Sequence, residues 1–380
     1  MNDEKLDDEK IVAMDVWHCQ CPVKSRRDHG IGSVVDHIDV VVVRLTSSSG
    51  LCGFGEASPW PVFNGTAEAS LAAFDRYFKP YVLGASVADH AAIMQVASRV
   101  VVDCSDAKAA LEAALLDLAG KSLGVPVSTL LGGAVRKTIP LSCSIANPDF
   151  NADIALTEQL QAHGIRIVKF KAGTHGHAHD IMRIEYFQKH FPEFSLRVDY
   201  NQGLLPSEAL RYVRDIDSMQ VDFIEQPVAA RHWDCMASLR SAIDTPLLAD
   251  ESIFTPTDMV RAVREKICDG VSVKIMKSGG LKASQCVAGI AEAAGLAVYG
   301  GDMFETGLAH LAGTHMIAAT PAITLGCEFY QARFYLEEDL LAEPFPIAEG
   351  EVVVPSLPGL GVEIDLDKVR SMSIASIRHE

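Results

Sequence analysis

From residue 139 onward, short apolar stretches alternate with helical ones, and this alternation constrains the fold more than any other feature of the sequence. Amphipathic helical segments such as 153–163 and 282–294 separate apolar stretches that recur roughly every 25 to 30 residues. Strand–helix alternation of this period predicts parallel βαβ units, and eight such units form a closed (β/α) barrel. An open doubly wound sheet is the alternative, but no GxGxxG motif follows a first strand. The predicted strands are 139–146, 165–171, 195–201, 221–227, 246–251, 270–276, 296–304 and 323–330.

The residues before this region follow a different pattern. Residues 36–60 are typical of two strands around a Ser/Gly turn, and residues 107–124 are rich in Ala and Leu at helical spacing. Strands followed by helices predict an α+β domain, whereas the end of the chain does not fit a further strand–helix unit. We therefore predict a first domain over residues 1–133, completed by residues from about 340 to 380, and a barrel over residues 134–339.

The composition is that of a globular protein with a large core, since 48% of the 380 residues are hydrophobic and 22% are charged. The formal net charge of −17 argues against nucleic acid or an anionic membrane as the main partner. The nine cysteines include no CxxC pair, no apolar run is long enough for a membrane span, and the acidic start is unlike a signal peptide. We therefore expect a cytoplasmic protein with a small-molecule substrate.

Five ionisable residues stand near the carboxyl ends of five successive predicted strands. They are separated by 28, 26, 25 and 24 residues, which is one strand–helix unit in each case. In a parallel barrel these strand ends surround one mouth, where such enzymes carry out their chemistry. Because a buried charge is costly unless it is paired or metal-bound, charged residues on strands of Val, Ile, Leu and Phe predict a functional site. The five residues are Lys171, Asp199, Glu225, Asp250 and Lys274.

The three carboxylates among them, Asp199, Glu225 and Asp250, predict a divalent cation. Without a nearby arginine they should repel each other and raise their pKa values, and a cation removes that repulsion. An all-oxygen site suits Mg²⁺, with Mn²⁺ as a substitute, rather than zinc, which favours His and Cys. The alternative is that each acid caps a helix or pairs at the surface, which is common for a single acid but not for three in register.

Several short motifs of this chain occur together in one known family. They are "KFK" (169–171), "DYN" (199–201), "EQP" (225–227), "DES" (250–252), "VKIMKSGGL" (273–281), "GFGEASPW" (53–60), "ALLDLAGKSLGVPVSTLLGG" (114–133) and "PGLGVEID" (358–365). Over nearly the whole chain they resemble the enolase superfamily, specifically its muconate-lactonizing-enzyme subgroup. The resemblance implies a modified (β/α)8-type barrel of the (β/α)7β form, with an α+β capping domain.

The resemblance also implies roles for the charged residues. It makes Asp199, Glu225 and Asp250 the Mg²⁺ ligands, and Lys171 and Lys274 the acid/base pair. A lysine on the sixth strand disfavours the mandelate-racemase subgroup, which uses a His–Asp dyad. The implied chemistry is abstraction of the proton α to a carboxylate, and it ends in racemisation if the second lysine reprotonates or in dehydration if a leaving group departs.

Lys169 and Lys171 are two residues apart on one strand, so their side chains point to the same side. The resemblance implies that Lys169 contacts the substrate carboxylate and holds down the pKa of Lys171. A free lysine titrates at about 10.4. A second ammonium, a dication and partial desolvation would each favour the neutral amine that a base needs.

Four further stretches are similar to the cis-3-hydroxy-L-proline dehydratases of this superfamily, namely 25–33, 55–66, 144–150 and 300–316. This similarity implies loss of water from cis-3-hydroxy-L-proline to give Δ1-pyrroline-2-carboxylate. Two alternatives use the same scaffold: an amino acid racemase or epimerase of the proline or N-acyl type, and a muconate cycloisomerase. A non-catalytic metal-binding scaffold is a third, but it would not need two opposed lysines.

Residues in these stretches are candidates for binding the substrate. His29, Trp60 and Phe63 are expected to enclose a small ring if the loops of the first domain reach over the barrel, with loop packing or a solvated turn as their alternative roles. Asn201, in the "DYN" motif, is a further substrate-binding candidate.

Acidic residues after the seventh strand are candidates for binding a substrate nitrogen. Asp302 and Glu305 are expected to hold the ammonium or imino nitrogen of an amino acid, although Asp302 could instead cap a helix, and Glu328 lies near the same rim. His310 and His315, on a helical stretch, are interpreted as packing residues. We also expect the chain to form a homo-oligomer.

Overall fold

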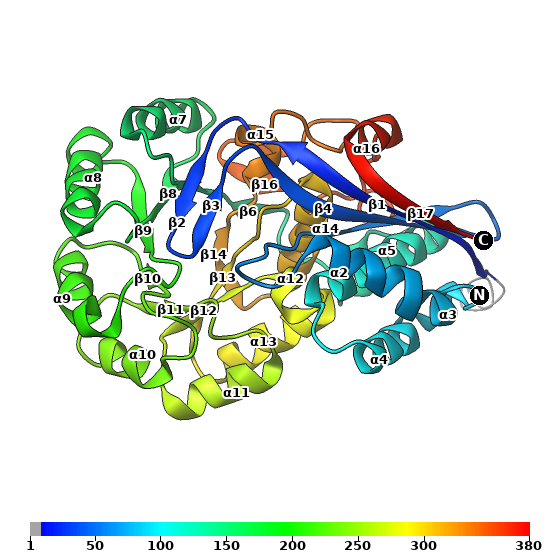
Figure 1. Cartoon of the computed structure of the whole chain (residues 1–380), viewed down its shortest axis with the longest axis horizontal. Coiled ribbons are helices and arrows are strands. Elements are labelled where there is room, and N and C mark those ends of the chain that lie inside the picture. The colour runs from blue at the N-terminus through cyan, green and yellow to red at the C-terminus, as the bar shows by residue number, and fades with distance from the viewer. Residues whose placement is uncertain (1–8) are drawn as a thin grey trace.

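The barrel expected from the strand–helix alternation is present in the structure, a computed structural model that describes residues 9–380 (Figure 1). Its eight strands form one parallel sheet in the order β14-β13-β12-β11-β10-β9-β8-β7, and a parallel bridge between Leu141 and Cys327 links its two ends. Each strand lies within one predicted stretch, so the fold prediction is confirmed. The strands are β7 (Ser142–Ile145), β8 (Ile167–Lys171), β9 (Ser195–Asp199), β10 (Ile224–Glu225), β11 (Leu247–Ala249), β12 (Gly270–Val273), β13 (Ala297–Gly300) and β14 (Ile323–Cys327).

Helices return the chain from strand to strand and surround the barrel (Figure 1). In α11 the cap residue Thr255 accepts a hydrogen bond from Asp258 N, and Pro256 occupies the first helical position, which fixes where the helix begins. All twelve residues of α14 are buried, because the first domain covers its outer side. The helices are α7 (Phe150–Ala162), α8 (His177–His190), α9 (Pro206–Asp217), α10 (Trp233–Arg240), α11 (Pro256–Glu265), α12 (Ile275–Ser278), α13 (Leu281–Ala293) and α14 (Gly307–Ala318).

A second, antiparallel sheet brings both ends of the described chain together (Figure 1). Its order is β17-β1-β4-β5, and α5 packs on β4 and β5. Glycines allow this close approach, since a Cβ at Gly53 would meet Ala114 O at 2.2 Å and one at Gly55 would meet Ala110 O at 2.0 Å. The elements are β1 (Ile11–Pro22), β4 (His37–Ser47), β5 (Cys52–Ala57), α2 (Ala67–Ala72), a π-helical turn (Ala73–Phe78), α3 (Lys79–Val82), a 3-10 turn (Val87–Asp89), α4 (His90–Val100), α5 (Ser105–Leu123), α6 (Val127–Leu130) and β17 (Ser373–His379).

A short hairpin of β2 (Arg27–His29) and β3 (Gly32–Val34) reaches from the first sheet to the barrel. Its tip rests on the loop after β9, where a Cβ at Gly30 would lie only 2.1 Å from Tyr200 O. A residue with a side chain would not fit there without a shift of the backbone. The hairpin therefore brings the residues around its tip to the barrel mouth.

The predicted strand 139–146 is divided between two sheets. β6 (Thr138–Pro140) pairs with β16, and only β7 joins the barrel. The domain boundaries predicted near residues 133 and 339 stay predictions. No helix within residues 9–380 is both long and apolar enough to cross a membrane. The remaining elements are α15 (Gln331–Phe334), β15 (Ile347–Ala348), β16 (Glu351–Val353) and α16 (Leu366–Met372).

Candidate active site

The five ionisable residues selected by their spacing come together at the carboxyl ends of the barrel strands. Strand pairing places Lys171 beside Asp199, and Asp199 beside Glu225. Asp250 directly follows β11, and Lys274 directly follows β12. All five are buried, with exposed fractions between 0% and 7%. The barrel thus holds five ionisable groups at one mouth, where each needs a partner.

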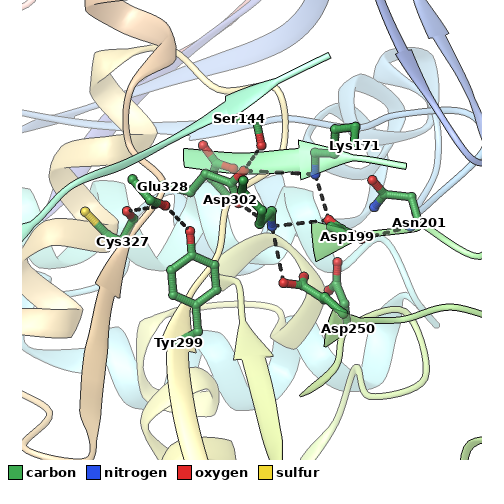
Figure 2. A network of polar contacts seen from close by, with 12 residues as sticks. Ser144, Lys171, Asp199, Asn201, Asp250, Tyr299, Asp302, Cys327 and Glu328 are labelled. Atoms are coloured by element: carbon green, nitrogen blue, oxygen red, sulfur yellow. Dashed lines mark hydrogen bonds and ion pairs between the residues drawn. The ribbon is translucent and has the colours of Figure 1, made fainter. Parts of the chain in front are cut away.

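Two of the carboxylates are each paired with a lysine. Lys171 Nζ lies 2.7 Å from Asp199 Oδ2, and Lys274 Nζ lies 2.7 Å from Asp250 Oδ2. The dashed line between Lys171 and Asp199 in Figure 2 marks the first of these contacts. Asp250 has a second cation that the spacing does not reveal, because Lys277 Nζ is 2.6 Å from its Oδ1. Lys277 lies in α12, three residues after Lys274 in the "KIMK" stretch, so a turn of helix brings it back to the same carboxylate.

Lys169 lies deeper than Lys171 and is only 1% exposed. Its Nζ is 2.7 Å from Glu328 Oε2, 3.2 Å from Asp199 Oδ2 and 3.3 Å from Glu225 Oε2. Burial alone would lower the pKa of Lys169, but these carboxylates outweigh it and raise the pKa well above its ordinary value. Asp199 and Glu328 contact both lysines of β8 and so hold them side by side, and Glu225 adds a contact to Lys169.

The same contacts shift the carboxyl pKa values in opposite directions. Burial alone would raise the pKa of Asp199, but Lys171 and Lys169 outweigh it and hold the pKa well below its usual range. Burial raises the pKa of Glu225 to about 7; Lys169 opposes this rise, while Asp199 and Asp250 add to it. The negative charge of Glu225 is thus less fully balanced by nearby ammonium groups than that of Asp199.

Three buried oxygens at this mouth, Glu225 Oε1, Glu251 Oε2 and Asn201 Oδ1, have no hydrogen-bond partner within residues 9–380. Burial raises the pKa of Glu251 to about 8, and the charges of Asp250 and Asp199 add to the rise. Within the described chain, no group of three or more His, Cys, Asp or Glu side chains is arranged to hold a metal ion. The ammonium groups of lysines balance the charges of Asp199 and Asp250 instead. Hard cations prefer carboxylate and amide oxygens as ligands, so the unpaired oxygens of Glu225, Glu251 and Asn201 fit Mg²⁺.

A pocket at the barrel mouth borders these charges. Lys171 and Lys274 both line it, and because β8 and β12 are four strands apart in the eight-stranded sheet, the two lysines approach from opposite sides. Five of the seven predicted substrate-binding residues line the pocket, whereas Lys169 and Glu305 do not. The lining residues are His29, Trp60, Phe63, Ser144, Lys171, Asn201, Lys274, Asp302, Met303, Phe304, Glu328, Tyr330 and Gln331.

Aromatic rings from three separate segments form one wall of the pocket. His29, Trp60 and Phe304 meet edge to face, with ring centres 5.1 to 5.6 Å apart. Phe63 lies under Lys274, whose Nζ is 4.8 Å from the ring centre. Phe304 is absent from the sequence-based set, although it stands between the two acids that are in it. These packed rings give the pocket an apolar wall, as small-molecule sites commonly have.

Another side of the pocket is acidic. Asp302 forms no ion pair with a lysine or arginine within the described chain, and its Oδ2 lies 3.5 Å from Nε2 of the His310 imidazole. Burial raises the pKa of Asp302 well above its ordinary value, and Glu328 adds to the rise (Figure 2). Glu305 lies behind and accepts a hydrogen bond from Met303 N at 3.0 Å. Asp302 is therefore a pocket carboxyl without a strong cationic partner.

Comparison with known proteins finds similarity over both domains. Residues 9–132 match the family described as mandelate racemase/muconate lactonizing enzyme, N-terminal domain, and residues 153–369 match the enolase C-terminal domain-like family. Muconate cycloisomerase 1 of Rhodococcus opacus is 34% identical over 346 residues, which cover 87% of this chain and 90% of that protein. L-Ala-D/L-Glu epimerase of Bacillus subtilis is 33% identical over 330 residues, with 85% and 88% covered. The crystal structure of a muconate cycloisomerase from Azorhizobium caulinodans has a TM-score of 0.84 and 42% identity, with 96% and 99% covered.

Proposed function

Because the chain belongs to the mandelate racemase/muconate lactonizing enzyme family of the enolase superfamily, we propose that it abstracts the proton α to the carboxylate of a small cyclic amino acid. The observation that carries the proposal is the pair of lysines, Lys171 and Lys274, that line one pocket from opposite strands. Such a carbon acid is weak, so the reaction needs a base at one face of the carbon and a stabilised carboxylate.

Asp199, Glu225 and Asp250 are the residues that would hold Mg²⁺, with Mn²⁺ as a substitute. Bound there, the cation would stabilise the negative charge that builds up on the substrate carboxylate. The unpaired Oε1 of Glu225 supports this assignment. Lys169 is enclosed by carboxylates and does not line the pocket, so in this proposal it neutralises them rather than touching the substrate.

Lys171 and Lys274 would act on opposite faces of the α-carbon. The amine of one lysine takes the α-proton, and the electrons of the C–H bond move toward the carboxylate. The other lysine, as an ammonium, gives a proton to the opposite face. Burial alone would lower the pKa of Lys274, but in the metal-free protein Asp250 outweighs it and raises the pKa. Lys274 is then held as the ammonium that a proton donor needs, which supports this role.

Asp302 supports a substrate with a cationic nitrogen. It lines the pocket without a lysine or arginine partner in the described chain, so an ammonium placed beside it would gain an ion pair and a hydrogen bond. Muconate, the compound in the names of several relatives, carries two carboxylates and no nitrogen. It would place negative charge beside Asp302 and Glu328, which weighs against it as the substrate of this chain.

Two outcomes use this chemistry, and each has its own support. Epimerisation at the α-carbon is favoured by the similarity to an L-Ala-D/L-Glu epimerase and by the opposed lysines. Dehydration of cis-3-hydroxy-L-proline to Δ1-pyrroline-2-carboxylate is the second candidate. It is supported by the pocket, to which each of the four stretches similar to such dehydratases contributes a residue: His29, Trp60, Ser144 and Asp302.

One experiment separates these outcomes. The protein is incubated with Mg²⁺ in D₂O with L-proline, cis-3-hydroxy-L-proline or cis,cis-muconate, and the products are followed by NMR. Epimerisation places deuterium on the α-carbon with no loss of water, whereas dehydration yields a cyclic imine that borohydride reduces to proline. Turnover of muconate alone, without deuterium uptake by any amino acid, would overturn the proposal.

A further inference from the structure

His310 is a buried imidazole without a close hydrogen-bond partner. It lies on α14 and is 0% exposed, and within residues 9–380 neither ring nitrogen has a partner at good hydrogen-bond geometry, although the side chain of Gln331 lies near enough to interact with the ring. Packing fixes the ring, which stacks on Phe329 with centres 5.0 Å apart and meets the ring of Phe345 at 5.3 Å. Buried polar groups are nearly always hydrogen-bonded, so a buried imidazole without a close partner needs an explanation.

The imidazole faces a carboxylate oxygen that also lacks a close partner. His310 Nε2 is 3.5 Å from Asp302 Oδ2, which has no partner at good hydrogen-bond geometry within the described residues, and 4.0 Å from Glu305 Oε2; the side chain of Gln331 lies near the same carboxyl group. The first distance exceeds the usual length of an N–H···O hydrogen bond by only a few tenths of an ångström. Asp302 itself lines the pocket. A small rotation of the carboxylate would thus close the hydrogen bond from behind the pocket wall.

We propose that His310 is a positioning residue that donates a hydrogen bond from Nε2 to Asp302 Oδ2 and so holds the other carboxylate oxygen toward the cationic nitrogen of the substrate. The inference rests on the proposed function, since only a substrate with an ammonium group needs that oxygen. A carboxylate already fixed in its bound orientation loses less conformational entropy on binding.

A neutral imidazole suits this task better than a lysine or arginine would. Burial lowers the pKa of His310 to about 4, and Glu56 and Asp339 only partly offset the fall. The ring is therefore uncharged at neutral pH and carries one N–H to donate. It can orient Asp302 without placing a positive charge beside it, so that the substrate ammonium itself favours the ionised carboxylate, whereas a cation there would compete with the substrate.

Two variants and two ligands test this role. His310→Phe keeps a flat ring against Phe329 but removes the donor, and His310→Gln retains an N–H at similar reach. The ligands are L-proline and tetrahydrofuran-2-carboxylate, which has oxygen in place of the ring nitrogen, and their affinities are measured by calorimetry with Mg²⁺ present. We expect His310→Phe to weaken L-proline binding about tenfold, as the loss of one hydrogen bond to a charged group would.

The nitrogen-free ligand supplies the internal control. Its affinity should change less than about twofold in His310→Phe, and His310→Gln should restore most of the affinity for L-proline. Equal weakening of both ligands would mean that the substitution only damages the pocket, and unchanged affinity for L-proline would mean that His310 does not act through Asp302. Either result overturns the inference while the wild-type protein still exchanges α-protons.

A second measurement needs no substrate. In ¹⁵N NMR spectra, with His310→Gln used for assignment, His310 should be the tautomer protonated at Nε2, and Asp302→Asn should shift its Nε2 signal. Protonation at Nδ1 instead would contradict the inference. Failure of the proposed function has a different signature, because then the wild-type protein neither binds L-proline nor exchanges its α-proton.

Discussion

Each pocket lysine is paired with a carboxylate, and these pairs determine how single substitutions act. Lys171 pairs with Asp199, and Lys274 pairs with Asp250, all four of them buried. Removing one ammonium leaves a buried carboxylate undercompensated, which typically costs about 3–5 kcal/mol unless a metal or a proton replaces the lost charge. The chemical role of a lysine is therefore best measured with Mg²⁺ at saturation, where the carboxylates keep a cation.

We expect Lys171→Ala and Lys274→Ala each to lower kcat about 10³-fold, because one face of the α-carbon then lacks its acid or base. Mg²⁺ binding, measured by calorimetry, should persist in both variants. Lys189→Ala, on the exposed face of α8, is the control and should retain full activity. Wild-type rates of proton exchange in both pocket variants would exclude them as the acid/base pair.

Mg²⁺ binding should strengthen as the pH rises from 6 to 8. A carboxyl group must lose its proton to bind a metal, and burial raises the pKa of Glu225 to about 7 in the metal-free protein. Below that value each pH unit should weaken binding up to about tenfold, with one proton released per Mg²⁺ bound. Calorimetry in buffers of different ionisation enthalpy counts that proton. Glu225→Gln should bind Mg²⁺ more weakly and with a flatter pH dependence; an unchanged slope would assign the proton to another group.

The charged residues differ in how well the sequence reveals them. Asp199, Glu225 and Asp250 can be found because they recur once per strand–helix unit. In a closed barrel, residues that recur at this period near strand ends gather around one mouth. Lys277 cannot be found in this way, since its contact with Asp250 depends on the turn of helix that follows β12. The surroundings of His310 depend on every neighbour of α14, which no local pattern contains.

At the level of elements, the β2–β3 hairpin decides how closely the pocket is covered. Gly30→Ala would place a Cβ 2.1 Å from Tyr200 O, so the tip must lift from the loop after β9. We expect KM to rise about tenfold with little change in Tm, because His29 moves away from Trp60 while the barrel core is untouched. Steady-state kinetics and thermal unfolding measure the two quantities.

Gly289→Ala provides the matched control for this substitution. Gly289 lies in α13, and a Cβ there would meet no atom within 4 Å, so alanine should raise stability by about 0.5–1 kcal/mol through its better helix propensity. Its KM should equal that of the wild type. An unchanged KM in Gly30→Ala as well would mean that the hairpin does not restrict the pocket.

Strands and helices of the barrel follow from local periodicity, but the pairing of distant loops does not. The strand predicted over 139–146 is cut in two, because residues 138–140 pair with β16 whereas residues 142–145 pair with β8. The aromatic wall joins His29, Trp60 and Phe304, which belong to three segments far apart in the chain. Only the three-dimensional arrangement of two domains brings them together.

For the whole molecule, α14 is one of the helices that tie the barrel to the first domain. Glu56, on β5, accepts hydrogen bonds from Thr306 N at 2.9 Å and Ala309 N at 3.3 Å, at the start of α14. Near its other end, His315 accepts from Ser128 N at 3.3 Å and donates to Leu360 O at 3.1 Å. These bonds join segments from both ends of the chain to the barrel, so we expect the parts to unfold together.

His315→Leu should lower the free energy of unfolding by about 2–4 kcal/mol at pH 7.5, because two buried backbone groups lose their partners. Urea unfolding followed by circular dichroism measures this change. His163→Leu is the control, since His163 is exposed at the end of α7. The kcat of His315→Leu should stay within about twofold of the wild type, because His315 does not line the pocket.

The cost of His315→Leu should also depend on pH, with a defined sign. Burial lowers the pKa of His315 to about 4, below the ordinary 6.5, so between these values the unfolded chain binds a proton that the folded protein does not. The stability from neutral His315 is thus full above pH 6.5 and is lost as the pH falls toward 4, by on the order of 3 kcal/mol. Leucine cannot titrate, so the difference in unfolding free energy between wild type and variant should shrink from pH 7.5 to pH 5. A difference that widens in acid would show that His315 is protonated in the folded protein.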